Sequence, residues 1–273
     1  MTDRIDLRDA LRVKPGSRVR LAKRDPGATF GWDKERAAPE LERQLVRLAD
    51  LQDRFWAEAK RSVLVVLQGI DAAGKDGTIN KVMEAFNPQG CPVTSFKAPS
   101  SEELAHDYLW RIHKATPRKG EIGIFNRSHY EDVLVVRVHD IVPKAVWSKR
   151  YDQINAFEEH LAANGTTIVK LFLSIDKDEQ RERFQARYDD PTKRWKFAMG
   201  DLKERERWED YQLAFDEALS RTSTDHAPWY VIPANRKWFR NLAVATILAD
   251  TMAELKPRYP AVADDVPADL VIA

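Results

Sequence analysis

Short apolar runs alternate with helix-like stretches along most of the chain. The apolar runs occupy residues 63–67, 122–125, 168–173 and 229–232, with a weaker run at 93–96. Buried parallel strands show this pattern because helices cover both faces of the sheet. Stretches with helical character lie between the runs, at residues 77–86, 101–114, 144–163, 178–188 and 240–255. The alternation predicts an α/β domain with a mostly parallel, five-stranded sheet flanked by helices.

A further helix is predicted before the first strand, over residues 39–60. Pro39 suits its first turn, where a missing N–H costs nothing. Apolar residues recur through it at helical spacing, namely Leu41, Leu45, Leu48 and Phe55. This stripe indicates a face packed on the core, and a dimer seam is compatible with it.

Both ends of the chain differ from this pattern. Residues 1–35 are rich in Gly, Pro and basic side chains, which favours an extended arm lying over the body, with its Lys and Arg on a solvated face. The last dozen residues are rich in Ala, Val and Asp and are expected to form a loose tail. No repeat of fixed period interrupts the rest, so residues 1–273 are predicted to form a single domain.

Composition narrows the class of protein. Of 273 residues, 43% are hydrophobic and 32% charged, which is typical of a globular chain, and the net charge is only +1. No global field therefore favours nucleic acid or a membrane surface as a partner. The N-terminus has no signal-peptide pattern, no apolar run is long enough to span a bilayer, and the single cysteine, Cys91, cannot form an internal disulfide. These features indicate a cytoplasmic protein.

The sequence GIDAAGKDG (residues 69–77) follows the first apolar run and precedes a predicted helix. Gly69, Gly74 and Lys75 have the spacing of a phosphate-binding loop, in which backbone N–H groups, a lysine and a helix N-terminus bind phosphate. Asp76 stands where such loops usually carry Ser or Thr. The residues expected to contact phosphate are Gly69, Ala72, Ala73, Gly74, Lys75, Asp76, Gly77 and Thr78.

A second polar cluster follows the apolar run 122–125. It reads Asn126, Arg127, Ser128, His129, Tyr130, Glu131 and Asp132. Arg127 can bind a phosphate through two hydrogen bonds, and Asp71 with Asp132 or Glu131 can hold magnesium. Ser128 and Glu131 also fit the capping box of a helix, but that interpretation leaves Arg127 and Asp132 unexplained.

Residues 178–211 form two helix-like arms around a turn at Asp190 and Pro191. Arg183 and Arg187 lie four positions apart and so share one helix face. A mobile, basic helical lid would bring cations over a transferring phosphoryl group and exclude water. An ordinary pair of solvated helices is the alternative interpretation, because Arg and Glu alternate along the segment.

Five stretches together resemble the polyphosphate kinase 2 family, over residues 12–260. They are GIDAAGKDG, SFKAPSSEELAHDYLWRIH, IFNRSHYEDVLVVRV, KRWKF and APWYVIPAN. The resemblance implies a phosphate-loop kinase core with a helical lid, similar to thymidylate kinase. It also implies transfer of the terminal phosphoryl group of inorganic polyphosphate to a nucleotide, with Mg²⁺ (Mn²⁺ as a substitute), in a homodimer or homotetramer.

The resemblance further implies roles for individual residues. Asp71 and Asp132 would bind the metal, Lys75 would hold the transferring phosphates, and Arg127 would hold the phosphates of the nucleotide. Arg183 and Arg187 would be lid arginines. Many members have Asp where this chain has Asn126. The Asn form of the motif resembles the subgroup that phosphorylates both nucleoside monophosphates and nucleoside diphosphates. AMP and ADP are therefore the favoured acceptors, with guanine nucleotides as further candidates.

Three alternatives remain beside this interpretation. An ATP-dependent nucleoside or nucleotide kinase would use the same fold with a different donor. A nucleotide-dependent switch is disfavoured because the chain lacks the Asn-Lys-x-Asp motif that reads guanine. A polyphosphate-binding protein without turnover is disfavoured by the presence of Asp71, Lys75, Arg127 and Asp132 together.

Overall fold

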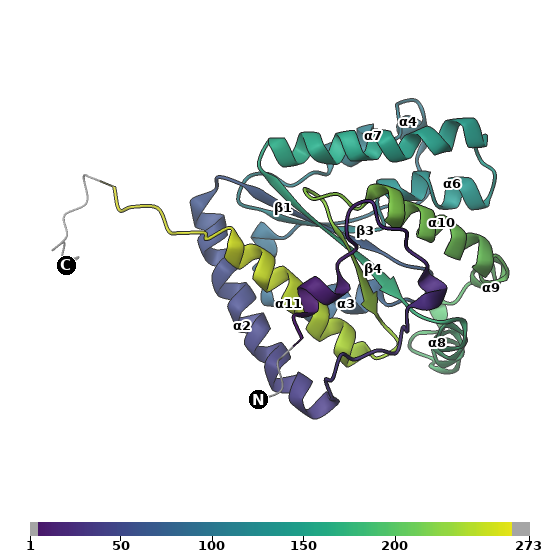
Figure 1. Ribbon diagram of the computed structural model, residues 1–273, viewed down its shortest axis with the longest axis horizontal. Helices are drawn as coiled ribbons and strands as arrows, with labels where there is room; N and C mark the ends of the chain where they lie inside the picture. Colours follow the sequence, from purple (N-terminus) through teal and green to yellow (C-terminus); the bar gives the residue numbers. More distant parts are fainter. Residues whose placement is uncertain (1–4, 264–273) are drawn as a thin grey trace.

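The computed structural model describes residues 5–263. The predicted tail lies outside the described residues from position 264 onward. In the described part, a five-stranded parallel sheet has helices on both sides (Figure 1). The fold class predicted from the apolar runs is confirmed.

The strands are β1 (Ser62–Gln68), β2 (Val93–Ser95), β3 (Ile122–Asn126), β4 (Thr166–Ser174) and β5 (Trp229–Pro233). They lie in the order β2-β3-β1-β4-β5, and every pair is parallel. All residues of β1 are buried, as are those of β5, because helices cover both faces. The carboxyl ends of β1 and β3 lie next to each other, since Leu67 pairs with Asn126.

Two groups of helices enclose the sheet. On one side α11 (Lys237–Glu254) packs against α2 (Lys34–Glu58) and α3 (Lys75–Val82). On the other, α10 (Trp208–Thr222) packs against α7 (Lys144–Ala163) and the short α6 (Val135–Val138). Figure 1 shows α2 and α11 crossing the sheet together and α7 running along its opposite side.

Several helix boundaries differ from the sequence-based predictions. Helix α2 begins at Lys34, because the Asp33 side chain accepts the N–H of Arg36 and caps it, so Pro39 lies inside the helix and not in its first turn. The predicted helix at 101–114 is two short helices, α4 (Ser101–Leu104) and α5 (Trp110–Lys114). Between them the Asp107 side chain accepts the N–H of Leu109, which starts a new turn.

Short helices complete the chain. The 3₁₀ segments are η1 (Leu21–Lys23), η2 (Met83–Ala85), η3 (Pro88–Gly90), η4 (His129–Asp132) and η5 (Arg194–Lys196). The predicted lid segment, 178–211, contains most of α8 (Lys177–Asp189), then η5, α9 (Met199–Glu206) and the start of α10. At its tip Trp195 is 77% exposed.

The N-terminal segment crosses the sheet edge at β5. It contains α1 (Leu7–Leu11), buries Leu7, Leu11 and Val13, and pairs Arg12 with Tyr230 in an antiparallel bridge. The N–H of Val13 donates to the carbonyl of Trp229 at 2.8 Å. The segment thus covers backbone groups of an edge strand that would otherwise be open to pairing. Within residues 5–263, no helix has both the length and the apolar character needed to cross a bilayer.

Candidate active site

The glycine-rich loop, residues 69–77, joins β1 to α3. Gly69 and Gly74 have φ angles of 155° and 106°, and a Cβ at Gly69 would lie 2.8 Å from the carbonyl oxygen of Leu173. Positive φ is readily accessible to glycine, so these two positions allow the sharp turn at the end of β1. Gly74 is the N-cap of α3, so the positive end of that helix faces the loop. The hydroxyl of Thr78 is buried and donates to the Gly74 carbonyl.

Lys75 is folded back along this loop. Its Nζ donates to the carbonyl of Gly69 at 2.6 Å, and only 9% of the residue is exposed. Burial lowers the pKa of Lys75, with Asp71 acting against the shift and Arg127 reinforcing it. A cation is thus held inside the loop at an electrostatic cost that a bound anion would reduce.

Arg127 follows β3 directly and faces the loop. Its guanidinium forms an ion pair with Asp71 at 2.8 Å, and its backbone N–H donates to Leu67 of β1. Its φ of 62° is uncommon for a residue with a side chain. Such conformations cluster at functional sites, where the surrounding structure holds them in place. Burial acts to lower the pKa of Arg127, but the charges of Glu131 and Asp71 raise it above its ordinary value.

Glu131 lines the same cavity as Asp71 and Arg127. The cavity has a volume of about 240 Å³, and Gln68, Gly69, Tyr211 and His139 also line it. Burial raises the pKa of the Glu131 carboxyl, while the charges of Arg127 and Lys75 act in the opposite direction. The cavity is thus lined by Arg127 and by the carboxylates of Asp71, Glu131 and Glu204, and it lies beside the loop that holds Lys75.

The structure places Asp132 elsewhere. Its carboxylate binds Arg150 of α7 at 2.9 Å, and it does not line the cavity that holds Asp71. Burial raises the pKa of Asp132, with Arg150 and Arg111 opposing the shift. Glu131, its neighbour on η4, faces the cavity instead, and the Ser128 hydroxyl accepts the N–H of Tyr130, so no Ser128–Glu131 capping box forms.

Asp76 and Asn126 contact each other across the end of the sheet. The Asn126 amide donates to Asp76 at 2.8 Å, which ties the first turn of α3 to the end of β3. This contact is a physical role for Asp76 that its position in the sequence did not reveal. An amide at position 126 can donate this hydrogen bond, whereas an ionised carboxylate there could not.

Arg183 lies behind the loop, on α8, with all its guanidinium nitrogens engaged. NH1 donates to the carbonyls of Ala72 and Ala73, NH2 donates to the carbonyl of Ala234, and Nε donates to Glu179. The Ala73 carbonyl therefore points toward α8. Because the C=O and the N–H of a trans peptide point in opposite directions, the N–H of Gly74 points away from α8.

Arg187 is one turn further along α8 and lies 3.5 Å from Asp201 of α9. The two arginines predicted to face a ligand together therefore have different neighbours. Arg183 binds the glycine-rich loop, and Arg187 links the two arms of the 178–211 segment.

Arg240 is a residue of this site that sequence reasoning missed. It lies on α11, is 3% exposed, and donates to the Asn241 side chain. Among residues 5–263 it has no carboxylate partner, and burial together with Arg183 lowers its pKa to about 10. Its guanidinium packs against Gly74 and Gly77. No local motif marks it, because Arg240 lies far from the loop in the chain.

Sequence reasoning also missed Tyr211, Glu204 and His139, which line the cavity. Tyr211 of α10 donates to Glu204 of α9 at 2.6 Å, and His139 contacts the same carboxylate at 2.9 Å. Only the position of Tyr211 at the end of the basic segment could have drawn attention to it.

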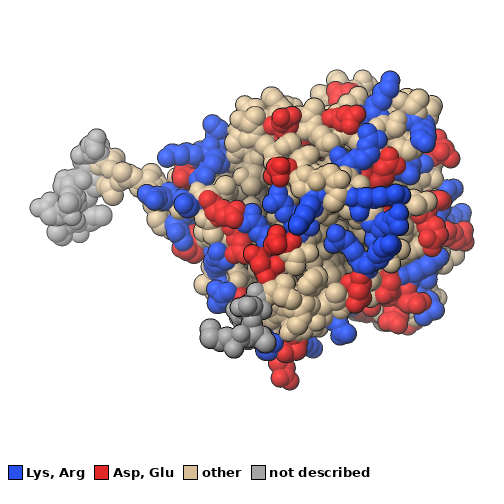
Figure 2. All heavy atoms as spheres, in the orientation of Figure 1, with Lys and Arg blue, Asp and Glu red and all other residues tan. Residues whose placement is uncertain are grey.

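Basic side chains gather on the face shown in Figure 2, where the N-terminal arm crosses in front of the sheet, although the net charge of the chain is only +1.

A glycine-rich loop with a buried lysine, at the carboxyl edge of a parallel sheet, is the arrangement of an α/β phosphate-binding protein. A sequence profile of the family Polyphosphate kinase 2 (PPK2) matches residues 31–260. The chain belongs to this family, as its motifs predicted.

Individual relatives agree with this assignment. The AMP/ADP-polyphosphate phosphotransferase of Meiothermus ruber is 54% identical over 91% of this chain and 94% of its own length. The ADP-polyphosphate phosphotransferase of Rhodopseudomonas palustris is 48% identical over 91% of each chain. The crystal structure of Polyphosphate Kinase 2 from Arthrobacter aurescens TC1 superposes with a TM-score of 0.93, at 45% identity, over 96% of this chain and 94% of that one.

Proposed function

We propose that this protein transfers the terminal phosphoryl group of inorganic polyphosphate to AMP and ADP. The observation that carries the proposal is the convergence of Arg127, Asp71 and Glu131 on one cavity beside the glycine-rich loop that holds the buried Lys75. The names of the two relatives support polyphosphate as donor and adenine nucleotides as acceptors. Guanine nucleotides are further candidate acceptors.

In this reaction Lys75 binds oxygens of the transferring phosphoryl group, and Arg127 binds the phosphate of the acceptor nucleotide. A phosphate oxygen of the acceptor is already ionised near neutral pH, so it attacks without a strong base. The rate enhancement comes from positioning the two substrates and from neutralising the charge that spreads over the phosphoryl oxygens. Arg127 uses one N–H for Asp71, and the remaining N–H groups of its guanidinium can bind a phosphate through two hydrogen bonds.

Mg²⁺, or Mn²⁺ in its place, is the metal that this site would hold. Magnesium in kinases is bound by one or two carboxylates together with substrate phosphates and water. Asp71 and Glu131 line the cavity and fit that requirement, whereas Asp132 is bound to Arg150. No cluster of three or more metal-binding side chains is present in residues 5–263, which is consistent with a metal shared with phosphates. When bound, the metal neutralises phosphate charge.

Segment 178–211 is the candidate lid. Its tip is exposed and carries Arg194, Lys193 and Lys196, while its base at Arg183 is bound to the loop. We expect the protein to act in the cytoplasm, as a homodimer or homotetramer. Its single cysteine is buried, which suits a reducing compartment.

The deciding experiment mixes the purified protein with Mg²⁺ and polyphosphate, and with AMP or ADP in separate reactions. We expect ADP and then ATP from the first, and ATP from the second. Parallel reactions replace polyphosphate with ATP as donor. Transfer from ATP alone would favour the nucleotide kinase alternative, and no product from polyphosphate would refute the proposal.

A further inference from the structure

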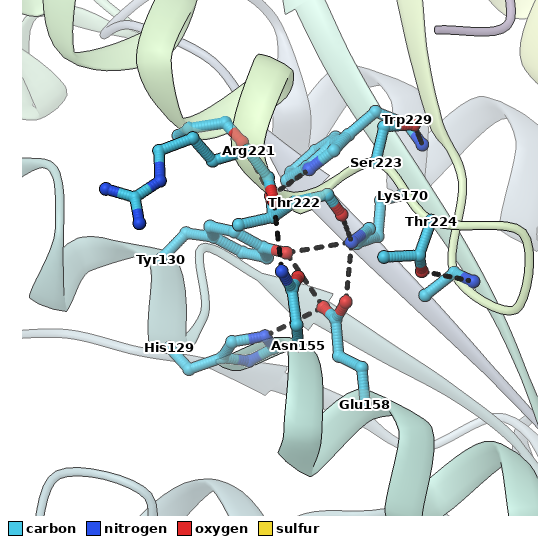
Figure 3. Close-up of polar contacts among 12 residues, drawn as sticks. His129, Tyr130, Asn155, Glu158, Lys170, Arg221, Thr222, Ser223, Thr224 and Trp229 are labelled. Atoms are coloured by element: carbon cyan, nitrogen blue, oxygen red, sulfur yellow. Dashed lines mark hydrogen bonds and ion pairs between the residues drawn. The ribbon is translucent and has the colours of Figure 1, made fainter. Parts of the chain in front are cut away.

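A buried group of charged and polar side chains lies directly behind η4. Glu158 of α7, Lys170 of β4 and both His129 and Tyr130 of η4 are fully buried, and their polar atoms meet at Glu158 (Figure 3). We call these four residues the Glu158 cluster. It lies outside the residues that line the cavity, and the proposed reaction does not use it.

The hydrogen bonds of the cluster are nearly complete. Lys170 Nζ donates to Glu158 Oε2 at 2.6 Å, to the Tyr130 hydroxyl at 2.8 Å and to the Thr222 carbonyl at 2.6 Å. These three bonds use all three donors of a lysine. Glu158 Oε1 accepts from Tyr130 at 2.9 Å and contacts His129 Nε2 at 3.1 Å.

The cluster joins η4 to the rest of the molecule. His129 and Tyr130 stand between Arg127 and Glu131 in the chain, and both bind one oxygen of Glu158. The ring of Tyr130 also packs edge-on against Trp229 of β5, with centroids 4.7 Å apart. Any shift of Tyr130 along η4 would break these contacts, and its neighbour Glu131 would move with it.

An ion pair at this depth contributes little net stability. Removing two charges from water costs several kcal/mol, and well-packed apolar residues of similar volume are often as stable or more so. The hydrogen bonds of Glu158 and Lys170 are directional, however, and they meet His129 and Tyr130 of η4 in one geometry. What the cluster supplies is orientation.

We propose that Glu158 and Lys170 are positioning residues that hold η4 so that Glu131 faces the glycine-rich loop. The catalytic part of this inference rests on the proposed function. The structural part, that the cluster fixes residues 127–134, does not, and the two parts are tested separately.

The first test is the paired variant Glu158→Leu with Lys170→Met, which removes both charges together. We expect kcat to fall on the order of tenfold or more, because small displacements of catalytic groups are costly, while the KM for polyphosphate changes less than about twofold. Thermal unfolding is expected to stay near that of the wild type. Wild-type kcat in a folded paired variant would overturn the inference.

The matched control is Ser62→Ala with Thr166→Val. These hydroxyls form a buried hydrogen bond of 2.9 Å between β1 and β4, at the amino end of the strands and so at the opposite edge from η4. Loss of this bond should leave kcat unchanged. An equal fall in kcat in the control would mean that general loosening of the sheet, and not orientation of η4, is responsible.

A second measurement asks whether the cluster acts through Glu131. The paired variant is combined with Glu131→Gln in a double-mutant cycle. If the cluster serves to orient Glu131, its removal should cost less than about twofold in kcat once that carboxylate is gone. If the fold-decrease in kcat of the combined variant equals the product of the two separate fold-decreases, this role is refuted.

Hydrogen exchange of residues 127–134 gives a result that needs no activity. We expect faster exchange confined to this segment in the paired variant, and none in the control. Unchanged exchange would overturn the inference whether or not the wild type transfers phosphate, whereas a wild type inactive with polyphosphate would overturn only the proposed function. If the paired variant does not fold, Tyr130→Phe, which loses a single hydroxyl, is measured in the same way with the same two deciding outcomes.

Discussion

At the scale of single residues, Lys75 holds a charge where the protein alone stabilises it poorly. It is almost fully buried, its pKa is lowered by burial, and carbonyl oxygens of its own loop are its hydrogen-bond partners. Phosphate oxygens would be stronger acceptors, because both partners would then be charged. Binding of phosphate would therefore exchange the loop carbonyls for charged acceptors and relieve the cost of burying the ammonium.

We therefore predict that Lys75→Ala lowers kcat by on the order of 100-fold or more, because a charged donor to the transferring phosphoryl group is lost. The measurement is ADP formation from AMP and polyphosphate. Lys81→Ala serves as control, because Lys81 lies on the same helix, is partly exposed and pairs with Glu84. Near-full activity of the Lys75 variant would reject its assignment.

The sequence indicated which residues lie near the glycine-rich loop, but not which of their side chains face the cavity. The loop, Arg127 and Glu131 were found because glycine spacing and charged residues after an apolar strand are local patterns. The choice between Glu131 and Asp132 depends on the turn of η4, which the contacts of Tyr130 with Glu158 and of Asp132 with Arg150 set. Both contacts join residues far apart in the chain, so no local pattern reveals them.

At the scale of elements, the glycine-rich loop is fixed from behind by two helices. Arg183 of α8 binds two of its carbonyls, and Arg240 of α11 packs against Gly74. A Cβ at Gly74 would collide with the Arg240 guanidinium, and its φ of 106° is unfavourable for any other residue. Gly74 thus serves both the turn and the packing of α11 on the loop.

Gly74→Ala is expected to destabilise the protein by about 1–3 kcal/mol, through backbone strain and the displaced arginine, and to lower kcat. Thermal unfolding measures the change in stability, and ADP formation from AMP and polyphosphate measures the change in kcat. Gly200→Ala on α9 is the control, since a Cβ there meets nothing and should stabilise slightly. A Gly74 variant as stable and active as the wild type would show that neither constraint matters.

Helices and strands were predicted correctly where a hydrophobic pattern extends over many residues. Helix ends were predicted wrongly where a side-chain hydrogen bond determines where the helix begins. The helix at 144–163 was predicted with the bounds that the structure gives, and all five strands were found. The start of α2 was misplaced because a single hydrogen bond from Asp33 extends it back past Pro39. Residues 101–114 read as one helix because their composition hides the turn at Asp107.

At the scale of the whole molecule, charge is distributed unevenly despite a net value of +1. Figure 2 shows basic side chains gathered over the N-terminal arm, with acidic side chains in separate groups elsewhere in the same view. Polyphosphate has many negative charges that can interact with such a surface, whereas AMP has few. Screening by salt should therefore weaken the two substrates unequally.

Raising NaCl from about 50 to 200 mM should increase the KM for long-chain polyphosphate roughly tenfold, as for other polyanions, and that for AMP by less than about threefold. The two constants are measured by varying each substrate at saturating amounts of the other. A parallel rise in both would contradict electrostatic binding of the donor along an extended surface.

The attachment of Arg183 to the glycine-rich loop has a mechanical consequence for the segment 178–211. Its base cannot swing outward without parting from carbonyls of the loop and of Ala234. Bending would therefore begin past that anchor, toward the turn where Trp195 protrudes. A long anhydride chain would then enter and leave beneath the tip of this segment, while the glycine-rich loop and Arg183 at its base kept their positions.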